Sequence, residues 1–138
     1  MYDFSVIIPA HNEENYIGKC LEAAVKAAKA VAPDTVQIIT VANRCTDRTA
    51  DIAMKYGSEI CLNESKCISS VRNTGIAAAK GKIIVTIDAD SAMTENSLKE
   101  IKQMLESGKY IGGGTRPVFD RTSAGIFFSS FYVALKLA

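Results

Sequence analysis

The feature of this sequence that most constrains its fold is the alternation of short apolar runs with stretches of helical periodicity. The apolar runs are rich in β-branched residues and occupy residues 4–9, 36–41, 59–62 and 82–87. Such runs are typical of parallel strands, which are buried because connecting helices cover both faces of the sheet. The sequence therefore predicts an α/β fold with a mostly parallel sheet flanked by helices on both faces.

Helical periodicity predicts a helix after each of the first two strands. Apolar residues recur at helical spacing from Tyr16 towards Pro33. Thr46-Asp47 forms a natural N-cap for a helix that ends before Gly57. The first half of the chain is therefore predicted to be a repeated unit of strand, loop and helix.

Two further helices and a short fifth strand are predicted in the second half. Gly81 can end a helix through residues 71–76, and Thr94 can cap a helix over residues 97–106. Residues 110–111 then begin a short strand that runs into three glycines.

Composition and charge exclude several classes of protein. The 138-residue chain has 48% apolar and 22% charged residues, as in an ordinary single domain, with 16 Lys and Arg against 15 Asp and Glu. Neither sign gathers in blocks, so no general field attracts nucleic acid. The four cysteines lack metal-binding or redox spacing, and the N-terminus lacks a secretory signal, so we expect reduced thiols and a cytoplasmic location.

Ligands of parallel α/β sheets bind beyond the carboxyl ends of the strands, so the residues after each strand are the candidates for a site. The first strand is followed by Ala10-His11-Asn12-Glu13-Glu14. A dinucleotide site needs a glycine-rich turn here, so dehydrogenase-type binding is disfavoured. Taken alone, the segment is as consistent with a helix opened by Asn12 and Glu13, with His11 in a polar loop, as with a ligand site.

Polar residues also follow the second strand and begin the third helix. Asn43 and Arg44 are free to meet a ligand, whereas Thr46-Asp47 behind them fits helix initiation better. Arg72 could hold phosphate oxygens in bidentate fashion, although in isolation a solvated arginine is the simpler interpretation.

The fourth strand ends in Asp88-Ala89-Asp90. Presenting two carboxylates directly after a buried strand is costly unless positive charge faces them. They suit a hard ion such as Mg²⁺ or Mn²⁺ that completes its shell with water and substrate phosphates, which implies a diphosphate ligand. The alternative is a turn-forming or helix-capping pair of aspartates, because this pattern alone is common.

Taken in order, the strand-end motifs resemble those of the family 2 glycosyltransferases, which have the GT-A fold. The motifs are residues 6–14, Cys45-Thr46-Asp47-Arg48-Thr49, Arg72-Asn73-Thr74-Gly75 and Asp88-Ala89-Asp90. The resemblance covers about residues 4–114. It implies a Rossmann-like nucleotide-binding sheet, a UDP- or GDP-sugar donor, Mn²⁺ or Mg²⁺, and transfer with inversion to an acceptor that is a saccharide, a lipid or a small molecule.

The resemblance also implies a set of site residues when it is carried over position by position. The residues that would bind the nucleotide-sugar are Pro9, His11, Glu13, Asn43, Arg72 and Asp88. The metal ligands would be Asp88 and Asp90, with Asp90 the more direct ligand and Asp88 nearer the ribose or sugar.

One departure from the family pattern concerns the nucleobase. Where the family commonly has two aspartates followed by Gly-Ser, this chain has Ala42-Asn43-Arg44-Cys45. Asn43 replaces a carboxylate that usually meets the base. Because an amide both donates and accepts hydrogen bonds, the base could differ from uracil or be held less selectively.

A second departure concerns the acceptor side. The resemblance divides the chain into a nucleotide-sugar-binding domain, residues 1–115, and the start of an acceptor-side segment, residues 116–138, so the fold is expected to be truncated. No catalytic base can be named, since Asp120 is the only acidic residue after Glu106 and lies in a polar stretch. The apolar stretch from Ile126 to Leu137 predicts a helix whose covering partner is absent, with a second subunit or the inner face of a membrane as alternatives.

Two functions therefore remain open. One is a metal-dependent glycosyltransferase, and the other is a fragment that binds a nucleotide-sugar without transferring it. A nucleotidyltransferase would call for a glycine-rich, basic loop after the first strand, and none is visible.

Overall fold

The computed structural model describes residues 1–114 and Val118. Four strands form one sheet in the order β3-β2-β1-β4, and every neighbouring pair is parallel. The strands are β1 (Tyr2–Ala10), β2 (Val36–Asn43), β3 (Glu59–Asn63) and β4 (Gly81–Thr86). The parallel sheet expected from the apolar runs is confirmed.

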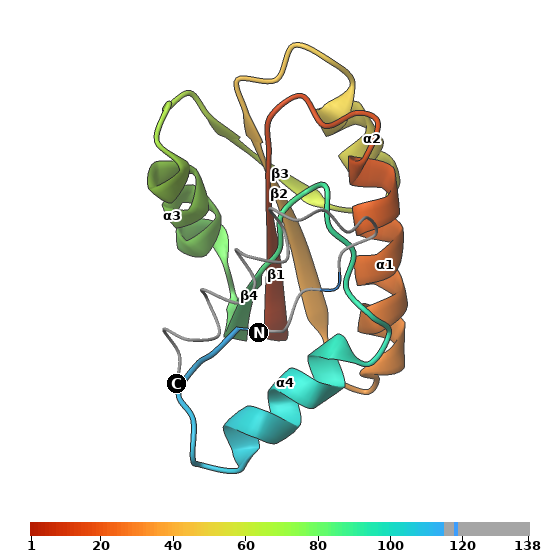
Figure 1. Ribbon diagram of the computed structural model, residues 1–138, viewed down its shortest axis with the longest axis vertical. Coiled ribbons are helices and arrows are strands. Elements are labelled where there is room, and N and C mark those ends of the chain that lie inside the picture. Colours follow the sequence, from red (N-terminus) through yellow and green to blue (C-terminus); the bar gives the residue numbers. More distant parts are fainter. Residues whose placement is uncertain (115–117, 119–138) are drawn as a thin grey trace, which may run out of the picture.

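Helices cover both faces of this sheet. They are α1 (Ile17–Ala30), α2 (Thr49–Lys55), α3 (Ile68–Ala78) and α4 (Ser97–Glu106). Figure 1 shows α3 on one face and α1 with α2 on the other, while α4 packs against α1 near its end. None of the helices in residues 1–114 combines the length and apolar character needed to cross a bilayer.

The side chains of β1 alternate between two apolar cores because successive residues of a strand point to opposite faces. Phe4, Val6 and Ile8 pack with α1 in one cluster, whereas Ile7 packs with Val71 of α3 in the other. All of these β1 side chains are fully buried. The continuous apolar run in the sequence therefore reflects a strand that is covered on both faces.

Two glycines allow α3 and β4 to lie very close to β1. Gly75 lies where α3 crosses the sheet, and an added Cβ would overlap the Ile7 side chain. Gly81 was expected to end a helix, and that expectation is wrong: it begins β4, where an added Cβ would overlap the backbone of Phe4 and Ser5. The helix before it already ends at Ala78.

Other expectations about element ends are also wrong. α2 begins at Thr49 with Arg48 at the N-cap position, although Asp47 Oδ1 still accepts a hydrogen bond from the Thr49 N–H at the start of the helix. Residues 110–111 form no strand in the described chain, where Ile111 is fully exposed. The helix over residues 97–106 is confirmed, although its N-cap is Asn96 rather than Thr94. The predicted helix from Ile126 to Leu137 lies outside the described residues.

The strand order reverses at β1. The chain runs outward from β1 to β2 and β3, and then returns to place β4 on the other side of β1. Loops that leave neighbouring strands in opposite directions open a crevice between them, which is where open α/β sheets bind ligands. The crevice in this chain lies between the segment after β1 and the segment after β4.

Candidate functional site

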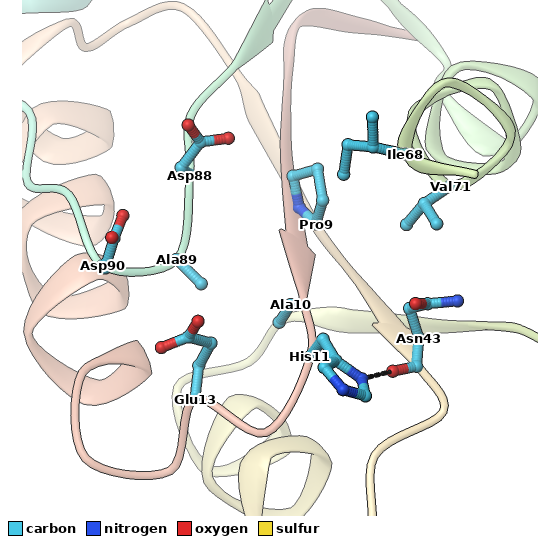
Figure 2. A pocket seen from close by; sticks show the side chains of 10 residues that line it. All are labelled: Pro9, Ala10, His11, Glu13, Asn43, Ile68, Val71, Asp88, Ala89 and Asp90. Atoms are coloured by element: carbon cyan, nitrogen blue, oxygen red, sulfur yellow. Dashed lines mark hydrogen bonds between the residues drawn. The ribbon is translucent and has the colours of Figure 1, made fainter. Parts of the chain in front are cut away.

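A cleft of about 260 Å³ lies at the carboxyl ends of β1, β2 and β4. It is lined by Pro9, Ala10, His11, Glu13, Asn43, Ile68, Val71, Asp88, Ala89 and Asp90, which Figure 2 shows converging from separate loops and from α3. Of the site residues that the family resemblance implied, all line this cleft except Arg72. The structure thus gathers residues that are up to about eighty positions apart in the chain.

His11 and Asn43 join the wall formed by β1 to the wall formed by β2. The His11 Nδ1–H donates a hydrogen bond to the Asn43 carbonyl oxygen at 2.7 Å, which leaves Nε2 of the neutral ring as an acceptor. The Asn43 side-chain amide donates to the carbonyl oxygens of Asn63 at 2.8 Å and Ser65 at 2.7 Å. Its donors are therefore committed to holding the segment after β3, whereas its carboxamide oxygen accepts no hydrogen bond from the described residues.

The segment after β4 exposes its two carboxylates and buries the residue between them. Asp88 and Asp90 are exposed, while Ala89 is only 3% exposed and packs into the core beside α1. Cys20 of α1 lies beneath this segment, and its thiol donates to the Asp88 carbonyl oxygen at 3.6 Å. Burial raises the pKa of the Cys20 thiol to about 12, so it is a neutral support rather than a reactive group.

Arg72 reaches the same site from α3. Its Nη2 donates to Asp88 Oδ1 at 3.0 Å, and both side chains are substantially exposed. An exposed ion pair of this kind contributes little to stability, so its importance lies in where it holds the guanidinium. Arg72 is kept at the rim of the cleft with further N–H donors available to a ligand.

Glu13 stands opposite the aspartate segment. Figure 2 shows its carboxylate turned towards Ala89 and Asp90. Partial burial raises the pKa of Glu13 above its ordinary value, and the negative charges of Asp90 and Asp47 raise it further. This side of the cleft therefore gathers three carboxylates, Glu13, Asp88 and Asp90, of which Asp88 is paired with Arg72.

The donor set of the cleft fits a hard divalent cation that is shared with a ligand. Among residues 1–114 no group of three acidic, histidine or cysteine side chains is close enough to enclose a metal ion alone. Mg²⁺ is commonly bound by one or two carboxylates together with waters and substrate phosphates, and Asp88 and Asp90 supply such carboxylates. A cation there would also relieve the charge that raises the Glu13 pKa.

Sequence reasoning missed the hydrogen bonds that join the loop after β1 to the loop after β2. Asn12 Oδ1 accepts from the Thr46 N–H at 2.8 Å, and Asp47 Oδ2 accepts from the Glu14 N–H at 3.0 Å. Asn12 has a left-handed backbone with φ of 54°, which turns its side chain towards the second loop. The available signal was the presence of short polar residues after two strands that are neighbours in the sheet.

Arg44, which was expected together with Asn43 to be free to meet a ligand, directly follows Asn43 but does not line the cleft itself. Its backbone is also left-handed, with φ of 47°. Its Nε atom is buried and has no hydrogen-bond partner among the described residues.

Fold and cleft together define a Rossmann-like α/β protein whose ligand site lies where the strand order reverses. The sequence pattern described as Glycosyl transferase family 2 matches residues 5–132. The chain therefore belongs to this family, and the resemblance drawn from the strand-end motifs is confirmed.

Curated relatives match about four fifths of this chain. Poly(ribitol-phosphate) beta-N-acetylglucosaminyltransferase TarS of Staphylococcus aureus (strain MW2) is 29% identical over 113 residues, covering 77% of this chain and 19% of that protein. Minor teichoic acid biosynthesis protein GgaB of Bacillus subtilis (strain 168) is 26% identical over 114 residues, covering 78% of this chain and 12% of GgaB. The uncharacterized glycosyltransferase Rv0539 of Mycobacterium tuberculosis (strain ATCC 25618 / H37Rv) is 29% identical over 115 residues, covering 83% of this chain and 49% of that protein. The chain thus spans about half the length of these relatives or less.

Solved structures share the fold. The crystal structure of S. aureus TarS matches with a TM-score of 0.67 and 24% identity, over 87% of this chain and 23% of that one. Glucosyl-3-phosphoglycerate synthase of M. tuberculosis, crystallised with Mn²⁺, UDP and glucosyl-3-phosphoglycerate, matches with a TM-score of 0.63 and 22% identity, over 78% and 41% of the two chains. These matches confirm the expected GT-A fold.

Proposed function

We propose that this chain binds a nucleotide-diphosphate sugar, UDP- or GDP-linked, in the cleft between β1 and β4, as part of a metal-assisted, inverting sugar transfer to an acceptor hydroxyl. The observation that carries the proposal is the convergence of His11 and Asn43 with the Asp88–Asp90 segment on one cleft at the point where strand order reverses. Membership of the glycosyltransferase family supports it.

The nucleoside is assigned to the wall formed by β1 and β2. Pro9 offers an apolar surface, and the Asn43 carboxamide oxygen accepts a hydrogen bond from the base. Because the Asn43 donors are already used, this oxygen suits an N–H of either uracil or guanine. Glu13 is assigned to the ribose side of the same pocket.

The diphosphate is assigned to the opposite wall. Asp88 and Asp90 would hold Mn²⁺ or Mg²⁺, which when bound supplies positive charge beside the phosphates. The Arg72 guanidinium, already at the rim through Asp88, offsets the negative charge that develops on the leaving diphosphate. Preorganised charge of this kind lowers the barrier because the groups need not reorient during the reaction.

The acceptor side is assigned to residues 116–138, which lie outside the described structure except for Val118. The acceptor remains a saccharide, lipid or small molecule. The stretch from Ile126 to Leu137 remains a predicted helix whose covering partner is absent, with a second copy or a membrane surface as the alternatives. The cytoplasmic location also stays a prediction. Donor binding without transfer is the second candidate function, because the chain spans only 12% of the GgaB relative and 49% of the Rv0539 relative.

The proposal is tested by titration calorimetry with UDP- and GDP-sugars in the presence of Mn²⁺ or of a chelator. We expect binding that needs the metal, and we expect Asp90→Asn to weaken it by about 10-fold or more, since loss of a metal-site group typically costs that much. The matched control is Glu100→Gln on α4, which removes one exposed negative charge away from the cleft.

Binding that is unchanged by chelator and by Asp90→Asn would contradict the metal assignment. Equal and weak binding of every nucleotide base would remove the specific role given to Asn43. A measured affinity with no turnover on any acceptor would favour donor binding without transfer.

A further inference from the structure

The Asp47 carboxylate lies between the loop after β1 and the start of α2, and its oxygens serve different segments. Oδ2 accepts a hydrogen bond from the Glu14 N–H at 3.0 Å. Oδ1 accepts from the Thr49 N–H at 3.0 Å and also from the Thr49 hydroxyl. One side chain therefore joins loops that are more than thirty residues apart in the chain.

Thr49 extends this connection by one more residue. Its hydroxyl oxygen accepts from the Glu13 N–H at 2.8 Å while its hydrogen is donated to Asp47 Oδ1. The side chain of Thr49 is fully buried, so water does not compete for these bonds. The successive N–H groups of Glu13 and Glu14 are thus held by Asp47, one through Thr49 and one directly.

Asp47 is held in its charged form by the same contacts. Burial acts to raise its pKa, but the hydrogen bonds from Thr49 and Glu14 outweigh that effect and leave the pKa below its ordinary value. Hydrogen bonds that an ionised carboxylate accepts are about twice as strong as neutral ones. The connection is therefore a strong one at neutral pH.

The segment that is fixed in this way carries a wall of the cleft. Glu13 and His11 both line the cleft, and Figure 2 shows them on the same stretch of chain after β1. Figure 2 shows the Glu13 carboxylate facing the segment of Ala89 and Asp90 across the cleft, so restraint of the Glu13 backbone decides where this carboxylate stands. The Asp47 contacts supply that restraint from behind, outside the cleft itself.

We propose that Asp47 is a positioning residue of the donor cleft: with the Thr49 hydroxyl it fixes the backbone of Glu13 and Glu14, so that the wall of the cleft is already in place before the nucleotide-sugar binds. This inference rests on the proposed function of the cleft. Preorganising a wall improves affinity because less ordering remains to be done on binding.

The first test is Asp47→Asn, compared with Asp51→Asn as a control. The asparagine amide group would place its own donors against the Glu14 or Thr49 N–H, whereas Asp51 is an exposed residue in the first turn of the same helix. We expect amide hydrogen exchange of Glu13 and Glu14 to rise in Asp47→Asn, with exchange in β1 and β2 unchanged, and to stay the same in Asp51→Asn. Unchanged exchange at both amides in Asp47→Asn would overturn the proposal.

The second test measures nucleotide affinity by calorimetry with UDP and GDP in Mn²⁺. We expect Asp47→Asn to weaken binding by about 10-fold, the size of effect typical for a lost hydrogen bond to a charged group. Equal affinity of Asp47→Asn and wild type would overturn the proposal. If the wild type binds no nucleotide, the proposed function fails, and the exchange result alone decides whether Asp47 fixes this segment.

A pair of variants at Thr49 covers the case in which Asp47→Asn does not fold. Thr49→Ser keeps the hydroxyl, and Thr49→Val keeps the shape without it. We expect Thr49→Val to raise Glu13 amide exchange and weaken nucleotide binding, and Thr49→Ser to retain most of both. Identical behaviour of the two variants would contradict the hydrogen-bonded connection.

Discussion

Arg44 combines a left-handed backbone with a buried Nε that has no partner among the described residues, and each of these features has a cost. A residue other than glycine at positive φ is destabilised by about 1–2 kcal/mol. Strain of this kind persists where the surrounding structure or a function maintains it. Arg44 directly follows Asn43, whose side chain reaches the cleft, so strain and candidate site coincide.

We predict that Arg44→Gly stabilises the chain by about 0.5–1 kcal/mol. Glycine adopts positive φ freely, and the relief of about 1–2 kcal/mol is partly offset by about 0.5–1 kcal/mol of extra freedom in the unfolded chain. Urea unfolding measures the difference. Arg48→Gly, at a φ of −87°, is the control and should gain nothing. A loss of stability in Arg44→Gly would show that the arginine side chain contributes more than the strain costs.

Among the secondary-structure elements, α3 forms one wall of the cleft, and its close packing on the sheet requires a glycine at position 75. Gly75 packs against Ile7 and Val41 of the sheet, and Ile68 and Val71 of the same helix line the cleft. The distance of α3 from the sheet therefore sets the position of these apolar groups.

Gly75→Ala is expected to destabilise the chain by about 1–3 kcal/mol, because the new methyl group overlaps Ile7 and the helix must move away. Gly18→Ala in α1 is the matched control, since its added Cβ meets only ordinary contacts such as the Tyr56 hydroxyl oxygen at 3.7 Å. That control should be neutral or stabilised by about 0.5–1 kcal/mol. The free energies of unfolding in urea distinguish the two, and equal effects would contradict the close packing of α3.

The elements that sequence predicted well are those that one segment determines by itself. Residues 4–9 were predicted to be a buried strand because they are almost continuously apolar, and the helix over residues 97–106 was predicted from the polar residues that precede it. The role of Gly81 was misread because a glycine after a helix looks like a helix end, while the backbone of Phe4 that requires it comes from the far end of the chain. A local sequence pattern cannot predict a contact with a residue that is distant in the chain.

The same distinction applies to the candidate site. The convergence of Asp88 and Asp90 with His11 could be predicted, because the carboxyl ends of parallel strands share one edge of the sheet. The contribution of Asp47 could not be predicted. Its sequence pattern accounts only for the hydrogen bond from the Thr49 N–H to Oδ1, whereas Oδ2 accepts from the Glu14 N–H of another loop. Side-chain direction across two loops is settled only by folding.

In the whole molecule, Asp3 joins the strands at the end of the sheet where they begin, which is the end opposite the cleft. Its carboxylate accepts from the Thr35 N–H at 2.9 Å, the Thr35 hydroxyl at 3.0 Å and Lys82 Nζ at 3.2 Å, and thereby joins the beginnings of β1, β2 and β4. These bonds, above all those from Thr35, lower the pKa of Asp3 from 3.8 to about 2.

The pKa of Asp3 is lower in the folded chain than in the unfolded chain. Its contribution to the free energy of unfolding is therefore complete above the unfolded value of 3.8 and is lost as the pH falls towards 2. We therefore expect Asp3→Asn to lower Tm at neutral pH. Between pH 3.8 and about pH 2, the Tm of this variant should fall less than the Tm of the wild type. Calorimetric scans across this range measure the difference. Parallel curves for the two proteins would contradict the assignment of acid sensitivity to Asp3.

The position of β4 beside β1 also has a consequence for the chain as it leaves the ribosome. β1 and β2 can pair once residues 36–43 have been made, but one side of β1 remains an open edge until residues 81–86 follow. An open strand edge invites pairing with other chains. During synthesis β1 is therefore an edge strand, and the strand that closes this edge also brings Asp88 and Asp90 to the candidate site.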